Sequence, residues 1–247
     1  MFIEEAIQSV LAQNYENFEH IIIDGGSTDN TLTILKKYPH LILVSEPDEG
    51  QSDAINKGFK RATGDIIGWL NSDDLYLPGT FEIVARELSN HKVDAIYSNY
   101  RDISSLGNIT KEYITQNSSK CMSLWICYIP STTFFFKRGI IDQGIIVDKD
   151  FHITMDKEFF AHIFYAGYNI QKANAFFAHF RWHDGNKSVP SKEIKNIRYI
   201  EGIKIANRYG KLQFSTNPIG VFLYKSMMLM CAAYRAFSRF FRVGVYK

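Results

Sequence analysis

The sequence contains few cysteines. Only Cys121, Cys127 and Cys231 occur among 247 residues, and their odd number and wide spacing argue against a disulfide framework and favour a reducing compartment. Small buried hydrophobic residues are the more ordinary role of such cysteines. Because 46% of the residues are hydrophobic and 22% are charged, a hydrophobic core can stabilise one domain, or one domain with an appendage.

Acidic residues are absent from the C-terminal part of the sequence. None follows Glu201, whereas eight lysines and arginines do. The whole chain has a formal net charge of only +2, and it contains neither an RNA-binding aromatic signature nor a zinc-finger spacing. We therefore expect no nucleic acid partner.

A long uncharged run is also missing. Lys225 and Arg235 interrupt the apolar end of the chain, so no run reaches the ~18–20 residues that span a bilayer. Arg235, Arg239 and Arg242 form one basic stripe beside aromatic residues, a pattern typical of helices at an anionic membrane surface. We expect residues 191–247 to form an amphipathic helical extension in peripheral contact with the inner, cytoplasmic face of the cell membrane. The alternative is that this helix docks on its own domain or on a second copy, as in a homo-oligomer.

Two common phosphate-binding loops are absent. A Walker loop needs a Gly-Lys-Ser/Thr ending, and the Rossmann fingerprint needs three spaced glycines. Neither occurs in this sequence, which disfavours an ATPase or a dehydrogenase.

The first half of the sequence alternates between helical and strand patterns. Helices are predicted around residues 6–11, 29–37, 53–63 and 81–88, and strands at residues 20–24, 41–44, 93–98 and from residue 66. Repeated units of this kind predict an α/β fold with a Rossmann-like, mostly parallel, doubly wound sheet flanked by helices.

One expected element is missing at the start. The chain opens within a helix, although this architecture normally begins with a central β-strand. We expect a truncated or misplaced start, with a later strand in the central position as the alternative.

Two adjacent carboxylates follow an apolar run. Asp73 and Asp74 end the segment at residues 65–74, and ligands gather where parallel strands end at their carboxyl edge. Mg²⁺ and Mn²⁺ usually bind through one or two protein carboxylates plus substrate phosphates, so this short motif predicts a metal and nucleotide diphosphate site. An ordinary Asx-rich turn is the alternative.

A second acidic turn follows the strand at residues 20–24. Asp24 ends this strand, and the glycines after it, including Gly26, let the backbone approach a ligand closely. In a parallel sheet Asp24 lies on the same edge as Asp73.

Four segments together resemble the ordered motifs of family 2 glycosyltransferases, which have the GT-A fold. They are residues 6–13, 23–29, 50–58 and 69–74. The resemblance implies an inverting transfer of a sugar from a nucleotide diphosphate sugar, with Mn²⁺ or Mg²⁺ as cofactor. It implies donor nucleotide contacts at Asp24, Gly26, Asp53 and Asp73, and Asp74 as the best metal ligand.

The sequence departs from the family pattern at two places. Many members have a second aspartate where Gly25 stands, and the family's first strand, which also contacts the nucleotide, is missing ahead of Met1. Both departures concern the side of the site that would bind the base.

Asp156 is the candidate general base. An inverting transfer needs a carboxylate within hydrogen-bond reach of the acceptor hydroxyl. The family places its catalytic aspartate or glutamate at a comparable helix start. The alternative for Asp156 is a helix N-terminal acid favoured by the macrodipole. Glu158 is the second choice, whereas Asp148 and Asp150 fit loop charges better.

Residues 180–188 resemble a segment that follows the base in related enzymes. Neutral imidazole can complete a metal shell, so His183 is a candidate metal ligand or diphosphate contact. Arg181 and Lys187 can offset diphosphate charge as the bond to the sugar breaks. A satisfied polar loop residue is the alternative for His183, and Trp182 more readily packs than stacks on a sugar.

These observations predict a GT-A glycosyltransferase domain at residues 1–190. The family resemblance and the basic C-terminal part favour bacterial surface polysaccharide or glycolipid synthesis, with a saccharide or lipid-linked acceptor. A nucleotidyltransferase and a non-catalytic, degenerate membrane-associated partner are the alternatives.

Overall fold

The computed structural model describes residues 2–187 and 189–243. It confirms the predicted alternation of helices and strands in the first hundred residues. The elements of this part are α1 (Ile3–Leu11), β1 (His20–Asp24), α2 (Thr31–Leu35), β2 (Leu41–Ser45), α3 (Gln51–Arg61), β3 (Ile66–Gly68), β4 (Leu75–Tyr76), α4 (Thr80–Leu88) and β5 (Ala95–Ile103).

The second part of the chain has a different element order. It contains β6 (Ile109–Tyr113), α5 (Lys120–Ser123), the 3-10 turn η1 (Ser131–Thr133), β7 (Phe135–Lys137), α6 (Gly139–Asp142), α7 (Met155–Tyr165), β8 (Ile170–Arg181), α8 (Lys192–Tyr209) and α9 (Pro218–Val243). Side chains cap some of these helices: the Ser191 hydroxyl accepts a hydrogen bond from the Ile194 N–H and so begins α8.

The main sheet is mixed, and the prediction of a mostly parallel sheet was wrong. Its strand order is β3-β7-β5-β8-β4, with β6 paired to β5. Among the described residues, β5 and β8 are its one parallel pair, and the other pairs are antiparallel. An apolar strand covered on both faces has the same sequence pattern in either kind of sheet, so its direction was not readable.

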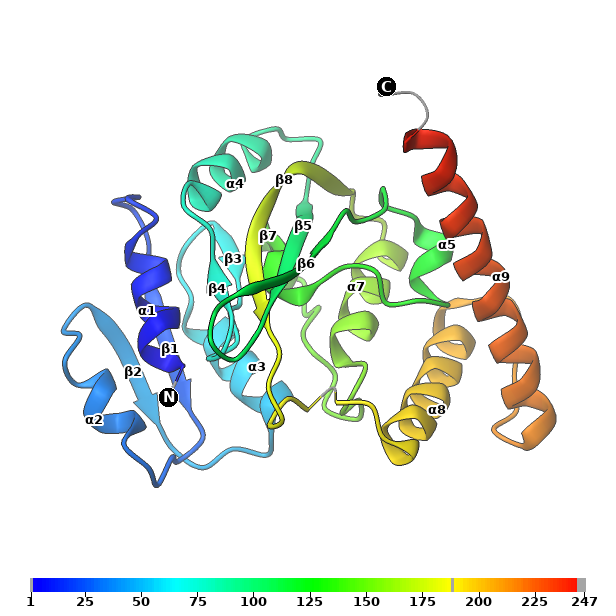
Figure 1. Cartoon of the computed structure of the whole chain (residues 1–247), viewed down its shortest axis with the longest axis horizontal. Coiled ribbons are helices and arrows are strands. Elements are labelled where there is room, and N and C mark those ends of the chain that lie inside the picture. The colour runs from blue at the N-terminus through cyan, green and yellow to red at the C-terminus, as the bar shows by residue number, and fades with distance from the viewer. Residues whose placement is uncertain (1, 188, 244–247) are drawn as a thin grey trace.

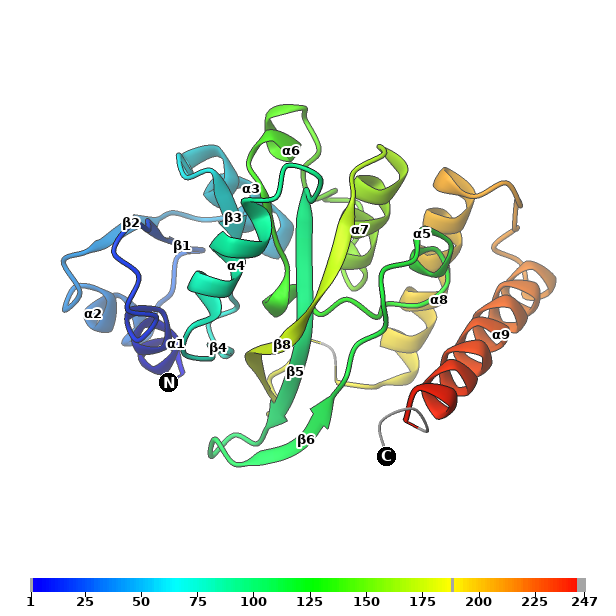
Figure 2. The same cartoon turned by 90° about the horizontal axis from the view of Figure 1, so that it is seen from above.

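Helices cover both faces of the main sheet. Ala95 and Tyr97 of β5 pack in one cluster with Phe159 of α7, whereas Ile96, between them, packs with Val84 of α4. Because successive strand residues point to opposite faces, α7 and α4 lie on opposite sides of β5. Figure 2 shows this three-layer arrangement.

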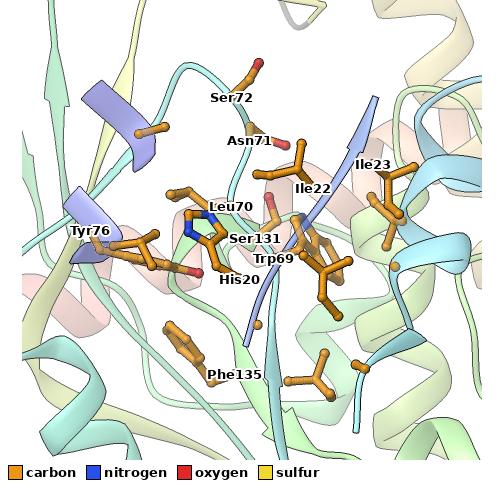
Figure 3. A pocket seen from close by; sticks show the side chains of 18 of the residues that line it. His20, Ile22, Ile23, Trp69, Leu70, Asn71, Ser72, Tyr76, Ser131 and Phe135 are labelled. Atoms are coloured by element: carbon orange, nitrogen blue, oxygen red, sulfur yellow. The ribbon is translucent and has the colours of Figure 1, made fainter. Parts of the chain in front are cut away.

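Strands β1 and β2 form a separate parallel pair at the left of Figure 1. Within the described residues β1 pairs only with β2, and β3 only with β7. A cavity of about 1060 Å³ is lined by residues 20–23 of β1 and by all of β3. Figure 3 shows Ile22 and Trp69 from its two walls. Since consecutive strand residues alternate in direction, this continuous lining means that the edges of both strands face the cavity.

The C-terminal helices pack on the domain. Tyr224 of α9 is 1% exposed, and its hydroxyl accepts a hydrogen bond from Lys157 Nζ at 2.9 Å. The opposite face of α9 exposes apolar side chains, including Phe222 and Leu229. No helix in the described part of the chain is both long and apolar enough to cross a membrane. The predicted basic stripe, Arg235, Arg239 and Arg242, has side chains that lie outside the described residues.

Candidate functional site

Three segments meet at one end of the cavity. They are the turn between β3 and β4, which carries Asp73, the loop after β8, which carries Lys187, and the start of α7, which carries Asp156. Figure 3 shows Asn71 and Ser72 of the first segment among the residues that line the cavity. The structure therefore brings together carboxylates and a cation from segments that lie far apart in the sequence.

Of the two adjacent aspartates, Asp73 lines the cavity and Asp74 does not. Asp74 is 0% exposed. Its Oδ2 accepts hydrogen bonds from Asn71 Nδ2 at 2.9 Å and Thr132 Oγ1 at 2.7 Å, and its Oδ1 accepts one from the Arg181 N–H at 2.9 Å. Burial, helped by the Asp73 charge, raises the pKa of Asp74 to about 6. In this geometry Asp74 holds the turn together, and Asp73 is the carboxylate available to a ligand.

His183 and Asp73 form a close pair. His183 Nε2 lies 3.0 Å from Asp73 Oδ2, and Asn186 Nδ2 donates to the same oxygen at 3.1 Å. His183 Nδ1 accepts a hydrogen bond from the Gly185 N–H at 3.2 Å, which places the proton of the neutral ring on Nε2.

The donor set of this pair fits a hard or borderline cation. Mg²⁺ and Mn²⁺ need only one or two protein ligands when substrate phosphates supply the rest, and imidazole can join a carboxylate. Across the described residues no group of three or more His, Cys, Asp or Glu side chains is placed to hold a metal by itself. The site thus fits a cation that is shared with a bound diphosphate.

Arg181 is buried and already engaged, at 1% exposure. Its Nε donates to the Asp73 carbonyl at 2.9 Å, its Nη1 to the Ser105 carbonyl at 3.2 Å, and its Nη2 to Glu5 Oε2 at 2.6 Å. The guanidinium also lies over the Phe2 ring, 4.6 Å from its centroid. Arg181 does not line the cavity, so its contacts tie β8 to the turn and to α1.

Lys187 is the cation that lines the cavity. Partial burial lowers its pKa, and the nearby carboxylates of Glu201 and Asp156 oppose this change. Its ammonium group therefore lies within electrostatic range of the predicted base.

Asp24 shapes its own loop. Its Oδ2 accepts hydrogen bonds from the Gly26 N–H at 3.2 Å, the Ser27 N–H at 3.1 Å and Ser45 Oγ at 2.7 Å. Burial raises the pKa of Asp24, but these hydrogen bonds outweigh it, so the pKa lies below its ordinary value. Gly26 has φ of 89°, where glycine is favoured. Asp24 lies in the β1–β2 sheet, outside the sheet that carries the Asp73 turn.

Gly25 lies against the side chain of Asp48. A Cβ atom on Gly25 would meet the Asp48 carboxylate, and the end of that side chain would have to shift. Asp48 therefore supplies a carboxylate beside the place where many family members have their second aspartate. The sequence pattern did not single out Asp48, because it is 23 positions further along the chain.

Asp53 is held by two lysines at the start of α3. Asp53 Oδ1 lies 2.6 Å from Lys149 Nζ, and Asp53 Oδ2 lies 3.2 Å from Lys57 Nζ. The hydrogen bond from Lys149 is the main reason that the pKa of Asp53 falls to about 2. Asp53 does not line the cavity, whereas its neighbour Gln51 does, and Gln51 donates to Asn71 Oδ1 at 3.1 Å. The nucleotide roles of Asp24, Gly26 and Asp53 remain predictions.

Asp156 has the environment of a base. Its Oδ1 accepts a hydrogen bond from the Lys157 N–H at 2.7 Å, and its Oδ2 lies 3.8 Å from Cys127 Sγ. Burial raises its pKa above the ordinary value, although these hydrogen bonds oppose the change. A carboxylate with a raised pKa accepts a proton more readily.

Glu158, the second choice, is committed elsewhere. It is 0% exposed, and its Oε1 lies 2.7 Å from Arg208 Nη1 and 2.5 Å from the Tyr209 hydroxyl. Glu158 thus joins α7 to α8, while Asp156 faces the cavity.

Comparison with known proteins identifies the family. The family model "Glycosyl transferase family 2" matches residues 2–164. An uncharacterized glycosyltransferase of Nostoc sp. is 24% identical over 227 residues, with coverage of 84% of this chain and 70% of the relative. The glucosyltransferase WfgD of Escherichia coli, whose name gives UDP-Glc as donor and α-D-GlcNAc-diphosphoundecaprenol as acceptor, is 23% identical over 90% of this chain and 89% of its own length.

Solved structures show the same fold. TarS of S. aureus (residues 1–349, with UDP-GlcNAc) matches with a TM-score of 0.66 at 17% identity, over 86% of this chain and 64% of that one. The mannosyltransferase PcManGT of Pyrobaculum calidifontis, with GDP-Man and Mn²⁺, matches with a TM-score of 0.61 at 18% identity, over 100% of this chain and 77% of that one. The fold is therefore α/β and GT-A-like, and the chain belongs to glycosyl transferase family 2.

Proposed function

We propose that this chain transfers a sugar from a nucleotide diphosphate sugar to an acceptor hydroxyl with inversion at the anomeric carbon. The observation that carries the proposal is that Asp73, His183, Lys187 and Asp156 line or border one cavity in a member of this family. The first three residues provide a place for a diphosphate and its cation, and the fourth provides a base.

Asp73 would hold the Mn²⁺ or Mg²⁺ ion together with the donor diphosphate. For His183 Nε2 to join as a ligand, the ring proton would move from Nε2 to Nδ1, and Nδ1 would give up the hydrogen bond that it accepts from the Gly185 N–H. Such an ion neutralises the charge that develops on the leaving group. Lys187 adds a positive charge on the same side of the cavity. In this proposal the hydrogen bonds of the buried Asp74 carboxylate hold the turn that carries Asp73. The solved complex of PcManGT with GDP-Man and Mn²⁺ supports a metal-bound donor.

Asp156 would act on the acceptor. Its carboxylate takes the proton of the acceptor hydroxyl as the hydroxyl oxygen forms a bond to the anomeric carbon. The bond between that carbon and the diphosphate oxygen breaks on the opposite face, and a nucleoside diphosphate leaves. One transfer therefore releases one nucleoside diphosphate and leaves one proton on Asp156, which passes to water before the next cycle.

The proposals for the acceptor and for the cellular location rest on a relative and on the exposed face of α9. The name of WfgD gives a diphosphoundecaprenol-linked acceptor. The face of α9 that does not pack on the domain exposes Ile219, Phe222 and Met230 at 70%, 66% and 59%. A lipid-linked acceptor and a peripheral contact of α9 with the cytoplasmic membrane face would fit these exposed side chains, in a bacterial surface polysaccharide or glycolipid pathway.

We also propose that an extended β-strand belongs in the part of the cavity between β1 and β3. A strand paired with both facing edges would join the two sheets into one. Phe2 lies beside the ring of His183, with centroids 5.0 Å apart. A strand leading directly into α1 would therefore end near Asp73 and run parallel to β1, and α1 would form the crossover between them.

An N-terminal fusion tests the strand. Seven Val- and Ile-rich residues joined ahead of Phe2 should raise Tm by about 4–8 °C, the shift expected for about 2 kcal/mol in a chain of this size. The matched control carries proline at the third and fifth added positions, because proline cannot complete the ladder. Equal Tm values for both fusions would contradict a strand site.

Donor turnover tests the transferase function. Purified protein is incubated with UDP- and GDP-sugars and with membrane lipid extract, with and without Mn²⁺, and the released nucleotide is identified. We expect the parent protein to release nucleoside diphosphate and Asp73→Asn to release none. Asp184→Asn, a change at an exposed position of the His183 loop, is the control and should leave the release unchanged. Release of pyrophosphate would favour a nucleotidyltransferase, and neither turnover nor nucleotide binding would favour a non-catalytic partner.

A further inference from the structure

Glu201 of α8 is a buried carboxylate that contacts the loop before α7. It is 4% exposed. Its Oε1 accepts a hydrogen bond from the His152 N–H at 2.8 Å, and its Oε2 accepts hydrogen bonds from the Ile153 N–H at 3.1 Å and the Thr154 N–H at 2.8 Å. The Thr154 hydroxyl also donates to Oε2 at 2.9 Å. One side chain thus binds three consecutive backbone amides and one hydroxyl.

These donors belong to the N-cap residue of α7, Thr154, and to the two loop residues before it. Thr154 is the N-cap residue of α7, and its own side chain caps no amide of that helix. Glu201, from a different helix, accepts from the N-cap amide and from the loop before it, and its negative charge lies at the positive end of α7. Hydrogen bonds to an ionised carboxylate are about twice as strong as neutral ones, so this contact fixes the loop firmly.

The loop that Glu201 binds leads directly to Asp156. His152, Ile153 and Asp156 all line the cavity, and Asp156 is the second residue of α7. The hydrogen-bond donors that meet the Glu201 carboxylate belong to this loop. The position of the Asp156 carboxylate therefore depends on the conformation of this loop.

A second contact fixes the rotation of α7. Arg208 and Tyr209, at the end of α8, both donate to Glu158 Oε1 in the first turn of α7. Glu201 of α8 thus holds the loop before Asp156, and the end of α8 holds Glu158, two positions after Asp156. Rotation of the first turn of α7 would break one set of contacts or the other.

We propose that Glu201 is a positioning residue, which sets the direction of the Asp156 carboxylate towards the acceptor and makes α8 part of the catalytic machinery. This inference rests on the proposed transferase function. It predicts that a change at Glu201 affects the acceptor step more than the donor side of the cavity. Asp73 and His183 belong to other segments, and Glu201 acts on the donor side only through its charge near Lys187.

Glu201→Gln tests the inference. The amide keeps the size of the side chain but turns an N–H₂ group towards the loop donors. The kcat for transfer should fall about 10–100-fold, the loss typical of a small misplacement of a reacting group. The donor KM and the Mn²⁺-dependent binding of nucleoside diphosphate should stay within about twofold. Glu193→Gln, at an exposed position of the same helix, is the matched control and should change neither value.

Hydrogen exchange gives a readout that does not depend on turnover. The amides of residues 152–156 should exchange about tenfold faster in Glu201→Gln than in the parent protein, while those of β5 stay unchanged. Thr154→Val, which removes one donor and keeps the carboxylate, should fall between the two proteins in both kcat and exchange. This milder variant decides the question if Glu201→Gln does not fold.

Two results would overturn the positioning role. One is an unchanged kcat with faster loop exchange, which would mean that the loop does not control Asp156. The other is a loss of donor affinity equal to the loss of kcat, which would mean a general loss of structure. A parent protein that turns over no sugar nucleotide refutes the transferase function instead, and the exchange data then still show whether Glu201 holds the loop.

Discussion

Replacement of Asp156 by asparagine removes the proposed base with little other change. Asparagine has the same shape, and its Oδ1 can still accept the hydrogen bond that Lys157 N–H donates at 2.7 Å. Because burial disfavours the charged form of Asp156, loss of the charge should not lower stability. General base catalysis contributes about 10²–10⁴-fold in rate, which is about 3–5 kcal/mol of transition-state stabilisation.

The assay measures transfer and donor binding separately. We expect kcat/KM for transfer to fall by about 10²–10⁴-fold, while donor affinity, followed by calorimetry with Mn²⁺, changes by less than about twofold. The control is Asp150→Asn at an exposed position of the preceding loop, which should retain full activity.

The pH profile gives an independent check of this prediction. A base must be deprotonated to act, so activity of the parent protein is lost as pH falls through the pKa of Asp156. Because that pKa is raised, the acid limb should lie above the range of an ordinary aspartate, and it should disappear in Asp156→Asn. A variant with activity within tenfold of the parent, or one that has lost donor binding, would refute the role of Asp156 as base.

Three further changes test other parts of the structure. Gly202→Ala places a Cβ atom against the Tyr224 ring and hydroxyl, so thermal unfolding should show a loss of about 1–3 kcal/mol. Arg181→Lys breaks a buried network, so urea unfolding should show a loss of about 3 kcal/mol while the donor KM is retained; the reverse pattern would favour a diphosphate contact. Because the pKa of Asp53 is lowered to about 2, its contribution to stability is present above about pH 4 and is lost towards pH 2. Urea midpoints at pH 6 and pH 3 should therefore differ less in Asp53→Asn than in the parent.

The local elements could be predicted because their causes are local. The strand at residues 20–24 and the helices of the first half have hydrophobic periodicities that depend only on neighbouring residues. The predicted strand at residues 20–24 agrees with β1 in full, and the predicted helix at residues 53–63 corresponds to α3, shifted by two positions. The short length of β3, three residues, was not predictable, since the apolar run at residues 66–70 continues past the last ladder contact.

The candidate site was predicted in composition but not in geometry. The acidic motif pointed to both Asp73 and Asp74, and only the packing of Thr132 and Arg181 against Asp74 separated the buried carboxylate from the available one. Sequence reasoning gave Arg181 and Lys187 the same role, although one is enclosed by three acceptors and the other lines the cavity. It also missed Asp48 and Glu201, whose relevance depends on contacts 23 and about 50 positions away.

The sequence by itself determined the family, the elements of the first half and the presence of a carboxylate-rich turn after a buried strand. These properties follow from short motifs and from periodicity, which act over a few residues. Only the tertiary structure decided the direction of the strands in the main sheet, the exposure of each carboxylate and the contact of α8 with the loop before Asp156. Such properties depend on which distant residues share a packed interior, and a buried charge acquires its role from those neighbours.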